Sequence, residues 1–255
     1  MSLRSVPLFL RPLAVAAVIV TVVSLLSSLL SRQIPPSPQL SARSFLVWLH
    51  GLGDSGPANE PIRTFFSSPE FNRTEWSFPS APLAPVTCNN GAVMHSWFDI
   101  YEIPVTAVSP NDENSVLEAV KTVHAIIDKE VAAGTPTKNI FICGFSQGGA
   151  LTLATVLLYP KTLGGGAVFS GWVPFNSSII ASISPGAKKT PMLWFHGMVD
   201  EVVLFDAGKA APSFLEQAGI QCEFKPQAYP SLGHSITKEE LQYLEPWIRT
   251  QLKSQ

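Results

Sequence analysis

Residues Asn139–Gly149 read NIFICGFSQGG, an apolar run followed at once by a glycine-rich turn. The run NIFIC is typical of a strand buried on both faces, and Gly144–Gly148 matches the pattern G-x-S-x-G. Residues 147–158 continue as a helix that ends before Tyr159-Pro160. This succession predicts a nucleophile elbow, in which small neighbours let a strained turn present Ser146 at a helix N-terminus. The alternative is an ordinary glycine turn with a helix-capping serine.

Strand and helix patterns alternate on both sides of this stretch. Apolar runs predict further strands at residues 45–49 (FLVWL), 166–170 and 191–195 (PMLWF). Helices are expected at 114–133, 206–218 and 238–252. Strands separated by helices predict the α/β class, with a mostly parallel central sheet covered by helices on both faces. Such sheets place their active sites at the carboxyl ends of the strands.

A serine hydroxyl needs a base to become a nucleophile, and folds with this elbow carry the partners in the order Ser, acid, His. Only His196 and His234 follow Ser146, and no acid lies between Ser146 and His196. The order therefore selects His234 as the base. Asp200 is the preferred acid because it lies just beyond the carboxyl end of the strand PMLWF. The other acids before His234 are Glu201, Asp206, Glu216 and Glu223.

The tetrahedral intermediate of acyl transfer needs two backbone N–H donors, which form an oxyanion hole. One is expected from Gln147, the residue after the nucleophile. The other is expected from Leu52, in the loop His50–Asp54 (HGLGD) that follows the first predicted strand. Gly51 and Gly53 would let this backbone approach a substrate closely. The alternative is a plain strand-to-helix turn, where glycines are common.

Composition excludes several other classes of protein. The chain has 255 residues and a net charge of −2, and its 46% hydrophobic content excludes a disordered chain. Three cysteines are too few for a disulfide-rich scaffold. The sequence contains no cluster of Lys and Arg that would predict a nucleic-acid partner. The histidines and cysteines lack metal-ligand spacing, and no phosphate-loop or dinucleotide fingerprint occurs. We therefore expect no cofactor and no metal.

The first 43 residues differ in charge from the rest. They carry four arginines and no acid, whereas residues 44–255 carry 13 basic and 19 acidic residues. Residues 13–30 (LAVAAVIVTVVSLLSSLL) are uncharged and would rise about 27 Å as a helix, close to the roughly 30 Å of a hydrocarbon core. We expect a membrane anchor, then a proline-rich tether at 33–43 and a catalytic domain at 44–255.

Other interpretations of the N-terminal segment stay open: a cleaved signal peptide, an organellar transit peptide or an untargeted extension. The protein is expected to be membrane-associated with its catalytic domain in the cytoplasm. The alternatives are a soluble cytoplasmic protein, or an organellar or secreted one after cleavage. Asn72 and Asn176 lie in glycosylation acceptor patterns, which are informative only if the body is lumenal.

Five motifs together carry a resemblance to one family: HGLGD, MHSWFD (94–99), GFSQGG (144–149), HGMVDEVV (196–203) and GHS (233–235). From about residue 44 to 252, the chain resembles the acyl-protein thioesterase/carboxylesterase family, in particular its plant branch. The resemblance implies an α/β-hydrolase fold and a serine hydrolase that cleaves acyl esters or thioesters. Ser146, Asp200 and His234 match the family's triad, and Leu52 and Gln147 match its oxyanion-hole residues.

The resemblance implies three kinds of substrate: acylated proteins, small acyl esters and lysophospholipids. Leu83, Trp97, Phe98 and Trp172 are expected to line an apolar acyl groove, with ordinary core packing as the alternative. His95 stands where the family commonly has proline, which keeps a short-chain carboxylesterase or deacetylase open. A non-catalytic ligand receptor on the same fold is the remaining alternative, although such a protein would commonly lack a triad residue.

Overall fold

The computed structural model describes residues 43–225 and 229–254. The predicted anchor at 13–30 and nearly all of the tether lie outside these residues. Within the part that is described, no helix combines the length and the hydropathy needed to cross a bilayer.

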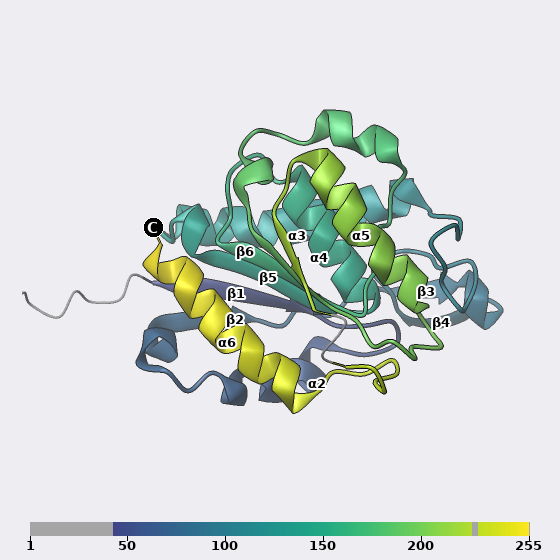
Figure 1. Cartoon of the computed structure of the whole chain (residues 1–255), viewed down its shortest axis with the longest axis horizontal. Helices are drawn as coiled ribbons and strands as arrows, with labels where there is room; N and C mark the ends of the chain where they lie inside the picture. Colours follow the sequence, from purple (N-terminus) through teal and green to yellow (C-terminus); the bar gives the residue numbers. More distant parts are fainter. Residues whose placement is uncertain (1–42, 226–228, 255) are drawn as a thin grey trace, which may run out of the picture. The chain divides into compact units, whose positions relative to one another are not determined.

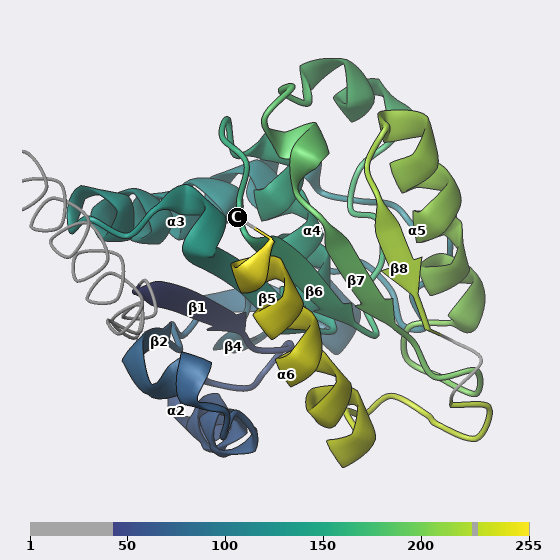
Figure 2. The same ribbon diagram turned by 60° about the vertical axis from the view of Figure 1, so that its left-hand side comes forward.

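The centre of the fold is a sheet of six strands, in the order β2-β1-β5-β6-β7-β8 (Figure 2). Every neighbouring pair is parallel, so the carboxyl ends of all six strands meet at one edge. A separate antiparallel pair joins β3 and β4. The strands are β1 (Ser44–Leu49), β2 (Thr74–Ser77), β3 (Leu83–Val86), β4 (Ala92–His95), β5 (Ile140–Phe145), β6 (Gly165–Phe169), β7 (Met192–Phe195) and β8 (Cys222–Phe224).

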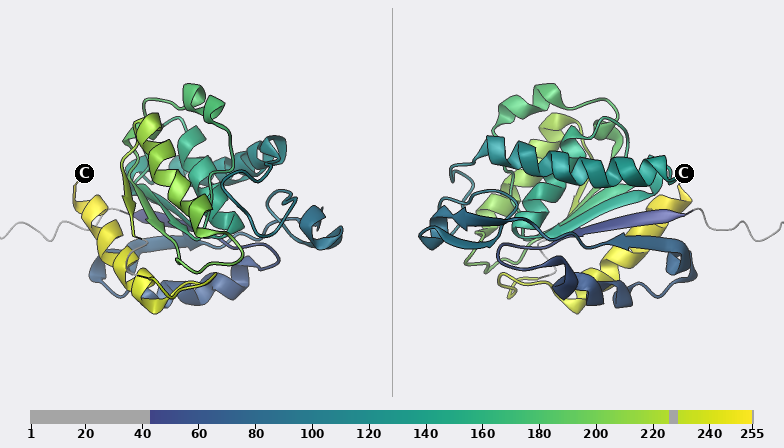
Figure 3. Two further views of the ribbon diagram at one scale, coloured as in Figure 1. Left: turned by 45° about the vertical axis from the view of Figure 1, so that its right-hand side comes forward. Right: turned by 180° about the vertical axis from the view of Figure 1, so that it is seen from behind.

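Helices cover both faces of the sheet (Figures 1 and 3). Helices α3 (Glu113–Ala132), α4 (Gln147–Leu158) and α5 (Phe205–Ala218) lie on one face, and α6 (Lys238–Lys253) lies on the other. The short elements are α2 (Gly56–Asn59) and the 3-10 turns η1 (Glu60–Phe65), η2 (Pro69–Arg73), η3 (Thr87–Asn89), η4 (Thr137–Asn139), η5 (Ser177–Ser182) and η6 (Ala187–Lys189).

Strand β1 shows why the sheet needs both helix layers. Successive side chains of a strand point to opposite faces, and every residue of β1 is buried. Val47 and Leu49 belong to the core under α3, α4 and α5, whereas Leu46 and Trp48 belong to the core under α6. A strand that is apolar on both faces can therefore sit only in the interior of a covered sheet.

The predicted α/β class and parallel sheet are confirmed, and the main predicted elements match within about two residues. Strands β2, β3 and β4 were not predicted. Their sequences TEWS, LAPV and AVMH are four residues long and only partly buried, and LAPV contains a proline. Such segments lack the apolar run or the strict alternation by which a strand is recognised in a sequence.

Candidate active site

Ser146 stands at the sharp junction between β5 and α4. Its backbone has φ 55° and ψ −119°, a left-handed φ that non-glycine residues seldom adopt. A Cβ on Gly144 would lie 2.3 Å from the Gly148 carbonyl oxygen, and one on Gly148 would lie 2.1 Å from the Leu49 oxygen. Both positions therefore require glycine, which explains the G-x-S-x-G spacing.

The imidazole of His234 contacts the serine directly. Its Nε2 lies 2.9 Å from Ser146 Oγ and its Nδ1 lies 2.8 Å from Asp200 Oδ2. Because a carboxylate only accepts, the proton of the neutral ring belongs on Nδ1, and Nε2 is left to accept from the serine hydroxyl. The Phe145 ring packs against the imidazole at 4.7 Å between centroids, and helps to hold it in this orientation.

Asp200 is buried beyond the carboxyl end of β7. Its Oδ1 accepts the N–H groups of Val202 and Val203, both at 2.9 Å, which leaves Oδ2 for His234. Burial alone would raise the pKa of Asp200, but the hydrogen bond and charge of His234 and the two backbone donors hold that pKa below its ordinary value. Asp200 is therefore a carboxylate whose second oxygen is aimed at the histidine.

A second histidine, His196, supports residues 200–204, the loop that carries Asp200 and that we call the acid loop. It is fully buried, its Nε2 donates to the Val203 carbonyl at 2.9 Å, and the same nitrogen lies 3.6 Å from Asp200 Oδ2. Burial lowers the pKa of His196, so the ring is neutral at pH 7. The residue order had only excluded His196 as the base. Its position four residues before Asp200 was the available signal for this supporting contact.

The HGLGD loop lies against Ser146. A Cβ added to Gly51 would meet Ser146 Cβ at 3.4 Å, and Leu52 lines the same cavity as Ser146. The Leu52 N–H donates to no acceptor in the part of the chain that the structure describes. Gln147 is the first residue of α4, where an N–H has no acceptor within the helix. Both predicted oxyanion donors are therefore near Ser146 and free of helix or loop partners.

His50 fixes the peptide unit that carries the Leu52 N–H. Its Nδ1 donates to the Gly51 carbonyl oxygen at 2.7 Å, and its Nε2 accepts from the Ala81 N–H at 2.9 Å. The Gly51 C=O and the Leu52 N–H belong to one planar peptide, so holding the carbonyl also orients the N–H. Burial lowers the pKa of His50, which favours the neutral ring that these two contacts require.

A cavity of about 220 Å³ opens beside Ser146 and His234. Its walls come from the HGLGD loop, from residues 100–105 and from the acid loop. The lining residues are Gly51, Leu52, Asp54, Ile100, Ile103, Val105, Phe145, Ser146, Trp172, Val202, Val203 and His234. A larger hollow of about 540 Å³ beside α3 contains none of the predicted site residues.

The structure separates the four residues that were expected to line an acyl groove. Trp172 lines the cavity beside Ser146. Leu83 is 66% exposed on β3 and is not among the lining residues. Trp97 and Phe98 are buried: Phe98 packs against Trp172, and Trp97 packs against His50. Of the four, Trp172 alone belongs to the wall of this cavity.

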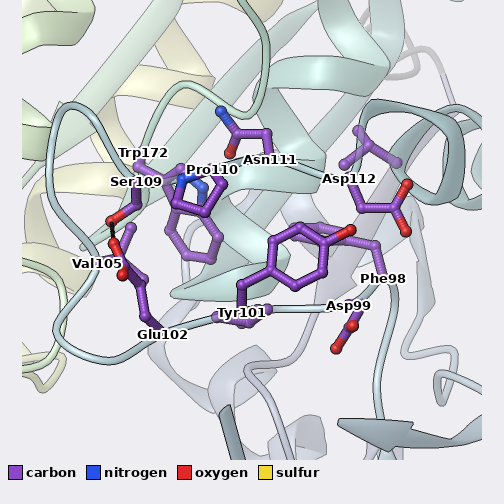
Figure 4. Close-up of a pocket in the computed structure, with 12 residues that line it drawn as sticks. Phe98, Asp99, Tyr101, Glu102, Val105, Ser109, Pro110, Asn111, Asp112 and Trp172 are labelled. Carbon is purple, nitrogen blue, oxygen red and sulfur yellow. Dashed lines mark hydrogen bonds between the residues drawn. The ribbon is translucent and has the colours of Figure 1, made fainter. Parts of the chain in front are cut away.

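A second, outer hollow adjoins the cavity and is separated from it by side chains that line both spaces. Figure 4 shows this outer hollow, which Tyr101, Glu102 and Pro110 help to line; Ser109 there donates to Glu102 at 2.6 Å. Val105 and Trp172 line both spaces, and the outer hollow has a volume of only about 10 Å³. It therefore offers no continuation for a long acyl chain.

Main-chain hydrogen bonds join residues 100–105, which we call the cavity wall, to the acid loop. The Val105 N–H donates to the Val202 carbonyl at 2.8 Å, and the Val105 carbonyl accepts from the Leu204 N–H at 2.9 Å. Val105 and Val203 form an isolated parallel bridge. The Val203 N–H also donates to Asp200, so the main chain of residues 202–204 supports both the cavity wall and the carboxylate of Asp200.

Comparison with known proteins places this geometry among hydrolases. The family model described as phospholipase/carboxylesterase matches residues 35–252. The carboxylesterase SOBER1 of Arabidopsis thaliana is 68% identical over 212 residues, which cover 83% of this chain and 92% of that protein. Its crystal structure matches with a TM-score of 0.81 at 67% identity, over 83% of this chain and all of that one. The acyl-protein thioesterase 2 of Zea mays matches with a TM-score of 0.72 at 27% identity, over 85% and 96% of the two chains.

Proposed function

Because the chain belongs to the phospholipase/carboxylesterase family of serine hydrolases, we propose that Ser146, His234 and Asp200 form its catalytic triad and cleave acyl esters and thioesters. The observation that carries this proposal is the unbroken chain of hydrogen bonds from Asp200 Oδ2 through the imidazole to Ser146 Oγ. The test is removal of the Ser146 hydroxyl.

The geometry supplies each proton transfer in the proposed reaction. His234 Nε2 takes the proton of Ser146 Oγ as that oxygen bonds to the acyl carbon, and Asp200 stabilises the imidazolium that forms. The Leu52 and Gln147 N–H groups donate to the resulting oxyanion. When the tetrahedral intermediate collapses, Nε2–H protonates the departing alkoxide or thiolate and an acyl-serine remains. His234 Nε2 then takes a proton from a water molecule as that water attacks the acyl carbon. When the second tetrahedral intermediate collapses, Nε2–H returns this proton to Ser146 Oγ and the carboxylic acid is released.

The cavity favours acyl chains of short to medium length. The cavity has a volume of about 220 Å³, and the hollow behind Val105 and Trp172 has only about 10 Å³, so a long acyl chain would extend beyond both. Burial of each methylene contributes about 0.8 kcal/mol, which equals about a fourfold gain in kcat/KM while the cavity is filling. Additional carbons would remain in water and contribute nothing.

An acyl-length series from C2 to C16 is expected to show this limit. With p-nitrophenyl esters, kcat/KM should rise by about three- to fourfold per methylene while the cavity is filling, and then level off or fall before C16. Ile103 lines the cavity and is 45% exposed, so Ile103→Ala should move the maximum to longer chains at little cost in stability. Val108→Ala is the matched control, since Val108 lies in the same loop, is 89% exposed and does not line the cavity. A steady rise to C16 in the unaltered protein would contradict the proposed limit.

We propose acylated proteins and small esters, rather than lysophospholipids, as the preferred substrates. Apolar side chains are exposed near the site, at Ile103 on the cavity wall and at Met198 and Val199 before Asp200, and these suit contact with a polypeptide. The likeness to an acyl-protein thioesterase points the same way. An octanoyl thioester on a peptide cysteine and p-nitrophenyl octanoate should therefore be hydrolysed faster than palmitoyl lysophosphatidylcholine, whose chain exceeds the cavity.

We propose further that residues 13–30 anchor the protein in a membrane, with the catalytic domain on the cytoplasmic side. The length and hydropathy of the segment support an anchor. The amino edge of the sheet also suits anionic headgroups, because exposed lysines precede two of its strands: Lys161 before β6, and Lys188 and Lys189 before β7. Each such residue near an anionic surface contributes about 1 kcal/mol.

The full chain, expressed in eukaryotic cells, is expected to stay with membranes through alkaline carbonate extraction. Val22→Arg near the centre of the segment adds about 3 kcal/mol to the cost of insertion and should release the protein, whereas Ser37→Arg in the tether should not. Asn72 and Asn176 are exposed, so a lumenal body would become glycosylated. A mass decrease on endoglycosidase treatment would contradict the cytoplasmic orientation, and loss of about 4 kDa from the N-terminus would indicate a cleaved leader instead.

A further inference from the structure

Trp97 donates two hydrogen bonds to two different parts of the site. Its indole Nε1–H donates to the His50 carbonyl oxygen at 2.9 Å, and its backbone N–H donates to the Gln147 side-chain Oε1 at 3.0 Å. The residue is 5% exposed, and both bonds are buried. One acceptor lies two residues before Leu52, and the other belongs to Gln147 itself. Leu52 and Gln147 are the two residues whose backbone N–H groups are proposed to bind the oxyanion.

The loop that carries Leu52 is held by the segment around Trp97 at both of its ends. Before Leu52, the His50 carbonyl accepts from the indole of Trp97. After Leu52, the Gly53 N–H donates to the His95 carbonyl at 2.8 Å. The Leu52 peptide is thus held between two bonds to residues 95–97, in addition to the bond from the His50 ring to Gly51.

The Gln147 side chain directs its polar atoms to the same segment. It is fully buried, and its Nε2 donates to Ser96 Oγ at 2.9 Å and to the Phe98 carbonyl at 2.6 Å. With the bond from the Trp97 N–H to Oε1, three bonds tie the first residue of α4 to residues 96–98. The side chain of Gln147 therefore connects α4 to this segment, while its backbone N–H is one of the two proposed oxyanion donors.

We propose that Trp97 is a positioning residue that joins the two halves of the oxyanion hole, and we call residues 95–98 the oxyanion brace. This inference rests on the proposed function, because it assigns a role in binding the oxyanion that Ser146 chemistry creates. Two donors stabilise a developing charge only if their separation and direction are set before the reaction. Buried hydrogen bonds are suited to this, since a buried acceptor left without a donor is unfavourable and resists displacement.

The test is Trp97→Phe in the full chain, which removes the indole donor and keeps the backbone N–H. We expect kcat for p-nitrophenyl butyrate to fall by about 10- to 100-fold with KM within about threefold, because the oxyanion is absent from the bound ester and develops only as the serine attacks. The inhibition constant of a short trifluoromethyl ketone, whose adduct with serine carries an oxyanion, should rise by a similar factor. The pH profile of kcat/KM should keep its midpoint, because His234 and Asp200 are not touched.

Trp194→Phe is the matched control. Trp194 is fully buried in β7, and its indole Nε1 has no hydrogen-bond partner among the described residues. This substitution therefore makes the same change of shape in a core without removing a hydrogen bond. It should shift the melting temperature, but leave kcat and the ketone inhibition constant within about threefold. If Trp97→Phe behaved in the same way as this control, the brace would be refuted.

A double-mutant cycle with Gln147→Met tests whether Trp97 acts as a connection between the two halves. Methionine keeps the length of the side chain and removes its three bonds to the brace. If Trp97 and Gln147 act through one connection, either substitution alone removes most of its effect. The double variant should therefore be only slightly slower than the slower single variant. Strictly multiplicative losses would overturn the proposal.

Should Trp97→Phe fail to fold, 3-benzothienylalanine at position 97 replaces the N–H by sulfur at nearly constant shape, with the same expected results.

Failure of the brace and failure of the proposed function are distinguishable. Turnover that survives Ser146→Ala would overturn the function itself. An inactive Ser146→Ala protein together with a Trp97→Phe protein of normal kcat would overturn the brace alone. Endpoint labelling with a fluorophosphonate measures the fraction of folded, reactive sites, so kcat can be expressed per active site in every variant.

Discussion

Replacement of Ser146 by alanine is expected to lower kcat by about 10⁴- to 10⁶-fold and to abolish labelling by fluorophosphonates. The substitution removes only the hydroxyl group, whose oxygen contacts His234 Nε2 at 2.9 Å and would accept the acyl group in the proposed reaction. KM should change little, because the cavity walls and the oxyanion donors remain. Steady-state hydrolysis of p-nitrophenyl butyrate and gel detection of the labelled chain provide the measurements.

Ser170→Ala is a close structural control for this substitution. Ser170 follows β6 as Ser146 follows β5, its φ is 48°, and its N–H donates to the Phe195 carbonyl at 2.9 Å, as the Ser146 N–H donates to the Phe169 carbonyl at 2.9 Å. Alanine at either position meets the same backbone strain, so loss of activity at position 146 alone identifies the nucleophile. If the unaltered protein failed to react with the fluorophosphonate, a ligand receptor on the same fold would be favoured instead.

Asp200→Asn is expected to lower kcat by about 10⁴-fold while leaving the fold intact. The Oδ1 of Asp200 accepts two backbone N–H groups, so the asparagine oxygen should keep that position and its NH₂ group should face His234. That NH₂ would donate to Nδ1, forcing the ring proton onto Nε2, where it points at Ser146 Oγ. The imidazole could then no longer accept the serine proton. The rate constant of fluorophosphonate labelling, measured beside kcat, should fall in parallel.

Asp206→Asn is the control that separates Asp200 from the nearest aspartate considered from the sequence. Asp206 is exposed in the first turn of α5, where an acid interacts favourably with the helix N-terminus. Its amide variant should retain kcat within about twofold. A large loss in Asp206→Asn combined with a mild effect in Asp200→Asn would transfer the role of the acid to Asp206.

The contacts among Ser146, Asp200 and His234 could be predicted from the sequence because each residue follows a recognisable local pattern. The elbow is fixed by a strand, two glycines and a helix, and the order of the partners then leaves one histidine. Asp200 was separated from later acids by its place beyond the carboxyl end of a strand, where parallel sheets bring their loops together. These are arguments from topology, and the confirmed parallel order of β1, β5, β6 and β7 is what makes them work.

The supporting residues could not be predicted in the same way. Trp97 was expected in an acyl groove because it lies in a loop-like stretch without the periodicity of a core element. Its indole instead donates to the backbone of His50, 47 residues away. His50 and His196 likewise contact carbonyl groups, of Gly51 and Val203. A backbone acceptor has the same chemistry in every residue, so a sequence carries no pattern that identifies it.

Main-chain atoms of Val105 join the cavity wall to the acid loop, so these hydrogen bonds do not depend on which side chain stands at position 105. The bonds of Val105 to Val202 and Leu204 use its N–H and C=O, which every residue except proline supplies in full. The exposed side chain at 103 can therefore be exchanged during evolution while the support of Asp200 stays in place, whereas Val105 is 3% exposed and tolerates only apolar side chains of similar size. The same property offers a route to laboratory evolution of chain-length variants, with libraries confined to the wall and proline excluded at position 105.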